Sequence, residues 1–229
     1  MDRLSIFKDR HAGQRCILVC NGPSLNGMEL SVLRHEVVIG LNKIHLGMDR
    51  FRFYPRYLVA VNDRVVAQSR EALQKLNCVK FISRRNSPTI SEDGLTHFIE
   101  TATPKKRFCT DIREGVHEGW TVTYAALQIA YHMGFQEVFI IGMDHRYVYR
   151  GAPNEARVLK GTDPNHFDPQ YFGGGQEWNN PDLDRSEESY RIARREFEQA
   201  GRRIYDATDG GACNVFEKID HRAVFGEAA

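Results

Sequence analysis

Apolar runs of strand length recur along the chain, and several of them stop at a polar residue. The runs occupy residues 16–20, 37–41, 57–61, 79–82 and 138–142, and a more mixed run follows at 203–208. Continuous apolar runs of this length are typical of strands buried on both faces of a parallel sheet. We therefore predict that these segments form one sheet, which the last run closes.

Segments of helical composition alternate with these runs. We expect helices at residues 28–33, 65–76, 121–133 and 185–200. The third ends before Gly134 and the last before Gly201, and glycine commonly follows the end of a helix. Alternation of strands and helices favours an α/β, Rossmann-like fold, with a mostly parallel sheet flanked by helices.

Two stretches lack this alternation. Residues 84–118 are rich in charge, threonine and proline, and we expect an insertion or a lid there. Residues 150–185 are polar and contain many Gly, Asn, Asp and Pro residues. Loops this long are often functional, so we predict a lid-like insertion at about 150–185 within a single nucleotide-binding domain that spans residues 1–229.

Polar side chains stand where four of the predicted strands end. Asn21, Asn42, Asn62 and Asp144 lie directly or almost directly after apolar runs. Ligands of open parallel sheets bind beyond the carboxyl ends of the strands, so these four side chains are candidates for a binding site. The alternative is that the asparagines serve turns, which they favour.

The first of these ends carries the turn Asn21-Gly22-Pro23-Ser24, which we predict to bind a nucleotide. Gly22 would let the backbone approach a ligand, and Ser24 would cap a helix or hydrogen-bond a phosphate. The turn is neither a GxGxxG fingerprint nor a P-loop, so ordinary dinucleotide binding and Walker-type hydrolysis are not supported. A tight turn with a cap is the structural alternative.

Two later segments add candidates for phosphate and sugar binding. Thr121 and Thr123 begin the best predicted helix, where amides and hydroxyls would hold an anion or simply cap the helix. Asp144 would accept from a ribose or sugar hydroxyl, and Arg146 would pair with a phosphate. His145 is a candidate for acid–base chemistry, or a structural residue.

The predicted lid contains several residues that could take part in catalysis or substrate binding. His166 is the best general-base candidate, and Asp163 and Asp168 flank it. Tyr171 and Trp178 supply aromatic walls for a substrate. No HxH or HxxxH spacing supports a metal site, although Mg²⁺ would accompany a phosphate substrate.

The composition of the chain limits the kinds of binding partner and the cell compartment that we expect. Lys and Arg total 31 against 30 Asp and Glu, and this balance opposes general affinity for nucleic acid. The five cysteines form no CxxC pair, as expected of buried, reduced thiols. The start of the chain lacks the apolar stretch of a signal peptide, and no segment has the length of a membrane span. We therefore expect a cytoplasmic protein.

Three blocks in order resemble a known superfamily. An apolar strand that leads into Asn-Gly-Pro-Ser-Leu at 21–25 is similar to the opening of bacterial lipooligosaccharide sialyltransferases. It also resembles Rossmann-like proteins named for the archaeal 6-hydroxymethylpterin diphosphokinase, a group that includes domains of flagellin glycosyltransferases. The second block is residues 121–144, and the third is residues 166–178 followed by the segments at 185–200 and 204–208.

The sialyltransferase resemblance implies a CMP-sugar site. It would use Asn21, Gly22, Ser24, Asn42, Asn62, Thr121 and Thr123, with Arg146 or Tyr147 near the phosphate. The sequence departs from that family at two places. A Thr-Ser-Gly motif becomes Thr121-Val122-Thr123, and the catalytic histidine of the Tyr-x-Gly-His lid motif becomes Gly174. His166 would then have to replace that histidine.

Three functions follow from these observations. The first is a nucleotide-sugar-dependent glycosyltransferase with a CMP-sugar donor, a glycan acceptor and no required cofactor, in which His166 is the base. The second is an ATP-dependent pyrophosphokinase that acts on a pterin-like alcohol. Its Mg²⁺ would be held by Asp144, Asp163 and Asp168. The third is a non-enzymatic nucleotide-binding domain of a cell-surface pathway.

Overall fold

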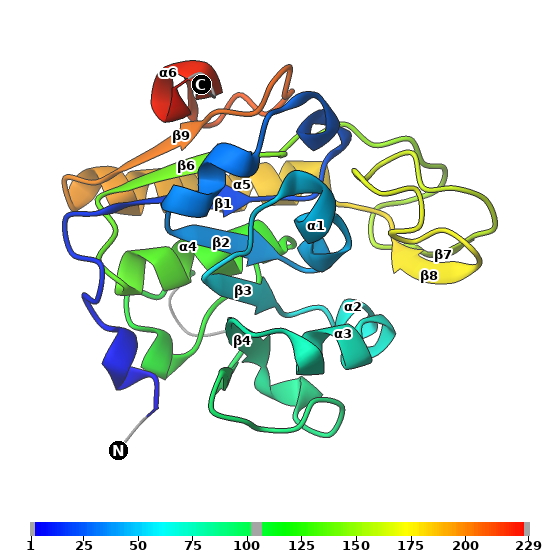
Figure 1. Cartoon of the computed structure of the whole chain (residues 1–229), viewed down its shortest axis with the longest axis horizontal. Coiled ribbons are helices and arrows are strands. Elements are labelled where there is room, and N and C mark those ends of the chain that lie inside the picture. Colours follow the sequence, from blue (N-terminus) through cyan, green and yellow to red (C-terminus); the bar gives the residue numbers. More distant parts are fainter. Residues whose placement is uncertain (1–2, 102–106, 227–229) are drawn as a thin grey trace.

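The centre of the protein is one eight-stranded sheet, which the computed structural model shows within residues 3–101 and 107–226 (Figure 1). Each adjacent pair of its strands is parallel. In space the order is β10-β9-β6-β1-β2-β3-β4-β5. The strands are β1 (Arg15–Val19), β2 (Val38–Leu41), β3 (Tyr57–Ala60), β4 (Val79–Ser83), β5 (Thr96–Ile99), β6 (Glu137–Ile141), β9 (Arg203–Asp206) and β10 (Glu217–Lys218). The predicted α/β, Rossmann-like sheet is confirmed.

The strand order reverses between β1 and β6. The chain runs outward from β1 to β5, returns to β6 on the other side of β1, and continues outward to β10. Val19 at the end of β1 is in register with Ile141 at the end of β6. A reversal of this kind opens a crevice at the carboxyl ends of the two strands, where ligands of such sheets bind.

Alternate side chains of the central strands enter separate cores on the two faces of the sheet. In β1, Cys16 and Leu18 belong to one apolar cluster, whereas Ile17 and Val19 belong to the other. The first cluster includes α4 (Val122–His132) and α5 (Leu183–Gln199). Burial on both faces explains why these strands read as continuous apolar runs rather than as alternating patterns.

The predicted helices are confirmed in part. The helices α4 and α5 lie where they were expected, but residues 65–76 form two helices, α2 (Asp63–Gln68) and α3 (Arg70–Lys75). Ser69 leaves the helical conformation between them. Two further short helices are α1 (Met48–Phe51) and α6 (His221–Phe225).

The helix predicted at residues 28–33 is wrong. The connection from β1 to β2 contains two 3₁₀ turns, Pro23–Gly27 and Ser31–His35, instead of an α-helix. Met28 between them is extended, and its buried side chain joins the core. The apolar residues of this connection enter the core from short 3₁₀ turns and an extended residue, so they do not form the continuous apolar face of an α-helix.

Strands also occur in the two stretches that showed no pattern. β5 lies within residues 84–118 and pairs with β4, and the strand that closes the opposite edge is β10 rather than 203–208. Within the predicted lid, β7 (Ala156–Leu159) and β8 (Gln176–Asn179) form a separate antiparallel pair, which projects beside the main sheet (Figure 1). We call residues 142–182, from β6 to α5, the insert.

No helix among the described residues has both the length and the apolar character to cross a bilayer.

We predict that the cysteines of the native protein resist thiol reagents. All five are reduced and buried, and burial raises the pKa of Cys20 to about 12 and that of Cys78 to about 11. Since the thiolate is the reactive form, Ellman's reagent should label them only as the protein unfolds. Five thiols should react at once in guanidinium chloride. Rapid labelling of the native protein near neutral pH would contradict this core.

Candidate functional site

A cleft with two adjoining chambers lies at the carboxyl ends of the strands. The outer chamber has a volume of about 660 Å³ and the inner chamber about 130 Å³. Trp120, Tyr147 and His166 line both, so the chambers meet at these side chains. Of the residues expected from the sequence, Asn42, Asn62, Thr121 and Trp178 border the outer chamber, and Asn21, Gly22, Asn42, Thr121, Thr123, Asp144, Arg146 and Tyr171 border the inner one.

The turns after β1 and β6 are bound to each other at the floor of the inner chamber. Asp144 accepts hydrogen bonds from the Ser24 amide at 3.1 Å and from the Ser24 hydroxyl at 2.7 Å. The Gly22 amide donates to the Gly142 carbonyl at 2.8 Å. A Cβ atom on Gly22 would stand 1.9 Å from a carboxylate oxygen of Asp144. Gly22 is therefore required by the approach of Asp144.

This geometry corrects the role expected of Ser24. Its hydroxyl caps no helix and is already engaged by Asp144, in a 3₁₀ turn that begins at Pro23. Asp144 in turn uses both carboxylate oxygens on Ser24. The pair therefore shapes the chamber, which Asp144 borders and Ser24 does not.

The strand-end asparagines differ from one another. The side-chain oxygens of Asn21 and Asn42 are buried and accept no hydrogen bond from any described residue, and that of Asn180 in the insert is in the same state. Asn62 instead accepts from the Val65 amide at 3.2 Å and caps α2. Buried acceptors without a donor are costly, so Asn21, Asn42 and Asn180 favour a ligand that brings hydroxyl or amino groups.

The start of α4 is already capped by Thr121. The Thr121 side chain accepts from the Thr123 amide and lies 3.2 Å from the Tyr190 hydroxyl. The Thr123 hydroxyl lies 3.6 Å from the Cys20 sulfur. The Thr121 hydroxyl therefore caps the helix, as the structural alternative expected, whereas the Thr123 hydroxyl contacts Cys20 and caps no helix. Trp120, directly before Thr121, is 40% exposed at the junction of the chambers, and the Arg185 guanidinium lies over its ring at 4.9 Å from the centroid.

His166 is held by a buried carboxylate. Its Nδ1 atom lies 2.8 Å from Asp163, and its ring stacks on Tyr171 with a centroid distance of 3.9 Å. Asp163 also accepts from the amides of Asn165 and Phe172. Burial by itself would raise the pKa of Asp163, but its hydrogen bonds and the imidazole lower it below its usual value. An imidazole that donates from Nδ1 to a carboxylate presents Nε2 as an acceptor.

A buried lysine that the sequence did not reveal ties the insert to the sheet. Lys43 follows Asn42, and its ammonium donates to the Tyr171 carbonyl at 2.6 Å and to the side chains of Gln68 and Gln176. Burial lowers its pKa to about 8, against a smaller opposing effect of Asp163. Two further cations border the outer chamber, Arg64 and Arg85, paired with Glu177 and Glu118. No local motif marks any of the three.

The residues after β6 divide into one exposed cation and two partly buried rings. Arg146 is exposed, borders the inner chamber and makes no ion pair with the described residues. Tyr147 borders both chambers and meets His166 edge to face. His145 lies 3.2 Å from Glu187, and burial lowers its pKa despite that carboxylate. The structural interpretation of His145 therefore fits its surroundings.

The carboxylates proposed for Mg²⁺ are not gathered into one site. Asp144 holds Ser24, Asp163 holds His166, and Asp168 accepts from the Gln170 amide and does not border the cleft. Within residues 3–101 and 107–226, no three His, Cys, Asp or Glu side chains are grouped as metal ligands would be. Gly174 adopts a φ of +70° and also lies off the cleft lining, so a histidine there would not face the chambers.

A family comparison matches the first two thirds of this architecture. A model of the family described as 6-hydroxymethylpterin diphosphokinase MptE-like matches residues 2–150. The chain belongs to this family. The match includes β1 to β6 and the floor of the inner chamber, and it ends before His166. This MptE-like protein has no match among curated proteins.

A solved structure supports the fold over the whole length. The glycosyltransferase MAf from Magnetospirillum magneticum AMB-1 is similar with a TM-score of 0.57 and 15% sequence identity. The similarity covers 97% of this chain and 38% of MAf, so this chain spans well under half of that protein. At this identity the likeness shows a shared fold.

We predict that Gly22→Ala is destabilising whereas Gly27→Ala is tolerated. The added methyl of the first variant would collide with Asp144 and the Gly142 carbonyl, and overpacking of this kind costs about 1–3 kcal/mol. Gly27 ends the 3₁₀ turn that Gly22 precedes, and it has no atom within 4 Å of an added Cβ. Urea unfolding of both variants measures the difference. Equal stabilities would contradict the proposed packing of the two turns.

Proposed function

We propose that this MptE-like protein is a glycosyltransferase that uses a nucleotide-linked sugar, with a CMP-sugar as donor. The observation that carries the proposal is the Asp163–His166 pair at the junction of the two chambers. A general base must reach the acceptor hydroxyl where donor and acceptor meet. His166 has that position, with Nε2 as its free acceptor.

The chambers suggest how the donor is arranged. At about 660 Å³, the outer chamber is in the size range of small-molecule sites, whereas the inner one is too small for a nucleotide. The nucleoside would occupy the outer chamber, and Trp120 would contact its base. The unpartnered oxygens of Asn42 and Asn180 would accept from amino or hydroxyl groups of the donor. The phosphate would reach the inner chamber at Arg146.

The reaction then needs no group beyond these. His166 takes the proton of the acceptor hydroxyl, and the oxygen forms a bond to the anomeric carbon of the sugar. The bond between that carbon and the phosphate oxygen breaks, and CMP leaves with the electron pair. Arg146 stabilises the departing phosphate, and Tyr147 is placed to donate to it. The negative charge of Asp163 stabilises the imidazolium that forms.

Family membership favours a second candidate, a diphosphokinase. The same base would deprotonate a pterin-like alcohol, whose oxygen would attack the β-phosphorus of ATP and release AMP. The acidic residues expected to hold Mg²⁺ are engaged separately and do not form a metal site, so we derive no step through the ion. This is the physical reason for placing the glycosyltransferase first.

A thermal-shift panel separates the candidates. CMP, CDP, UDP, GDP, ADP and ATP are each tested with and without Mg²⁺, because a ligand that binds only the native state raises the melting temperature. We expect stabilisation by CMP and CDP without metal. Stabilisation by ATP only with Mg²⁺ would place the diphosphokinase first. If no nucleotide raises the melting temperature, both proposed enzymatic activities would be contradicted, and a domain with another function would be favoured.

We predict that His166→Ala lowers kcat for sugar transfer by about 10²–10⁴-fold, because it removes the base. The affinity for CMP should stay within about twofold, since nucleotide contacts remain. Asp168→Asn on the same insert is the matched control, because Asp168 lies off the cleft and the amide oxygen preserves its bond to Gln170. Single-turnover kinetics and calorimetric titration of CMP measure the two effects. Undiminished transfer by His166→Ala would exclude it as the base.

We also predict that Arg146→Ala weakens CMP binding about tenfold, through loss of one charge-assisted contact to the phosphate. Cytidine, which lacks the phosphate, should bind the variant and the original protein equally. Arg150→Ala is the control, since Arg150 is exposed nearby but does not border the cleft. Equal losses for CMP and cytidine would show that Arg146 acts on something other than the phosphate.

A further inference from the structure

A second hollow lies at the opposite end of the sheet from the cleft. It has a volume of about 450 Å³. Its sheet residues stand at the amino ends of the strands: Arg56 precedes β3, Tyr57 and Val79 begin β3 and β4, and His97 is the second residue of β5. The cleft borders the carboxyl ends of the same parallel strands, so the two cavities are separate.

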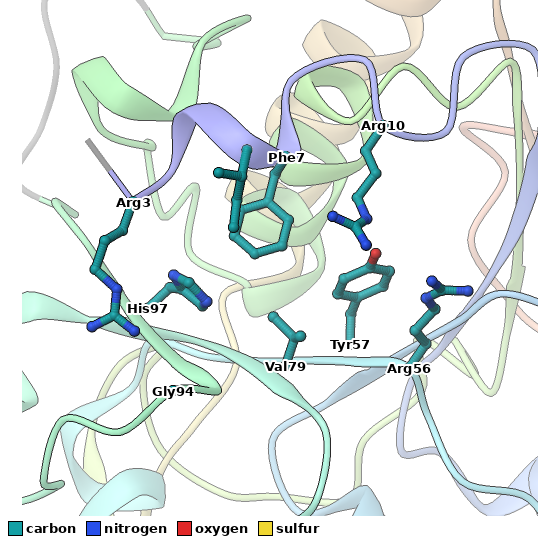
Figure 2. Close-up of a pocket in the computed structure, with 9 residues that line it drawn as sticks. Arg3, Phe7, Arg10, Arg56, Tyr57, Val79, Gly94 and His97 are labelled. Atoms are coloured by element: carbon teal, nitrogen blue, oxygen red, sulfur yellow. The ribbon is translucent and has the colours of Figure 1, made fainter. Parts of the chain in front are cut away.

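Three arginines and a buried histidine line this hollow. They are Arg3, Arg10, Arg56 and His97, and none of the described residues that line the hollow is acidic. Figure 2 shows Arg10 and Arg56 on the side of Tyr57, Arg3 and His97 on the opposite side, and Phe7 and Val79 between them. Arg3 pairs with Glu92, whereas Arg10 and Arg56 make no ion pair with any described residue. Two unpaired guanidinium groups therefore border one cavity.

The floor between these cations is apolar and rigid. Phe7 and Tyr57 are 2% and 1% exposed and contact each other edge to face. The Tyr57 hydroxyl is already bonded to His11 at 2.8 Å. Tyr57 thus offers a ring rather than a hydroxyl, and the floor suits the body of an organic molecule rather than a bare ion.

His97 gives an independent indication of a missing partner. Its side chain is 5% exposed, and its buried Nδ1 atom has no hydrogen-bond partner among the described residues. Its other face packs on Phe7, with ring centroids 4.8 Å apart. A buried imidazole with an unused nitrogen beside arginines is costly to maintain without a ligand.

From these observations we propose that the hollow binds a small organic anion. An anionic head, phosphate or carboxylate, pairs with Arg10 and Arg56, an apolar or aromatic body lies on Phe7 and Val79, and a polar group at the far end of that body meets Nδ1 of His97. Arginine pairs recognise both kinds of head through charge-assisted hydrogen bonds. This site is independent of the reaction proposed for the cleft and of its substrates.

The test uses phenyl phosphate, benzoate and inorganic phosphate as probes in calorimetric titrations of the full chain. We expect saturable binding of phenyl phosphate or benzoate, with the tighter one identifying the head, and weaker binding of inorganic phosphate, which lacks the body. Arg10→Ala with Arg56→Ala should weaken the tighter probe at least about tenfold. All variants are compared by thermal melting, and these exposed arginines are not part of the core.

Two controls make the result specific. Arg70→Ala with Arg195→Ala removes the same charge from exposed helix positions outside both cavities, and Arg146→Ala alters only the cleft. Both should leave binding within about twofold, a change too small to represent a lost contact. Both tryptophans, Trp120 and Trp178, border the cleft and none borders this hollow, so their emission should stay unchanged on binding. Absence of saturable binding, an equal loss in Arg70→Ala with Arg195→Ala, or a loss in Arg146→Ala would overturn the proposal.

Discussion

The hydrogen bonds between Asp144 and Ser24 join the two turns at which the strand order reverses. The inner chamber of the cleft lies against this contact. The contact leaves no room for a side chain at Gly22, and it fixes the backbone of the first turn, whose Asn21 carbonyl accepts from the Phe167 amide of the insert. A parallel sheet opens a crevice at such a reversal, and here Asp144 sets its floor.

The insert owes its position to contacts with the ends of two strands. After β1, the Asn21 carbonyl accepts a hydrogen bond from the Phe167 amide. After β2, the Lys43 ammonium donates to the Tyr171 carbonyl. Tyr171 stacks on His166, and Asp163 holds the other side of that imidazole. The orientation of His166 therefore derives from the sheet, even though its segment carries little regular structure. A base placed in this way keeps its geometry without a substrate, which lowers the cost of orienting it during reaction.

The sequence was most informative where burial acts on consecutive residues. β1 to β4 and β6 are buried on both faces and were visible as apolar runs, whereas the edge strand β5 has Thr96 and His97 before its two apolar residues and was not. The rule that ligands bind at strand ends pointed to Asn21, Asn42 and Asp144, which border the inner chamber, but it did not show that Asp144 accepts from Ser24. The role of Lys43 was not predicted because its three acceptors come from distant parts of the chain. Contacts of that range leave no local periodicity to detect.

The two enzymatic candidates demand nearly the same site. In each, a hydroxyl is deprotonated and a nucleoside monophosphate leaves, so both use a base and a phosphate-binding cation, and the diphosphokinase would use Mg²⁺ in addition. They differ in the atom attacked, which is an anomeric carbon in one and a phosphorus in the other. That atom is decided by what lies opposite His166, and thus by how far the nucleotide extends from the outer chamber toward Arg146. In the proposed arrangement, a donor whose single phosphate reaches Arg146 would leave the sugar carbon beside the base, which is why we propose a CMP-sugar rather than a triphosphate.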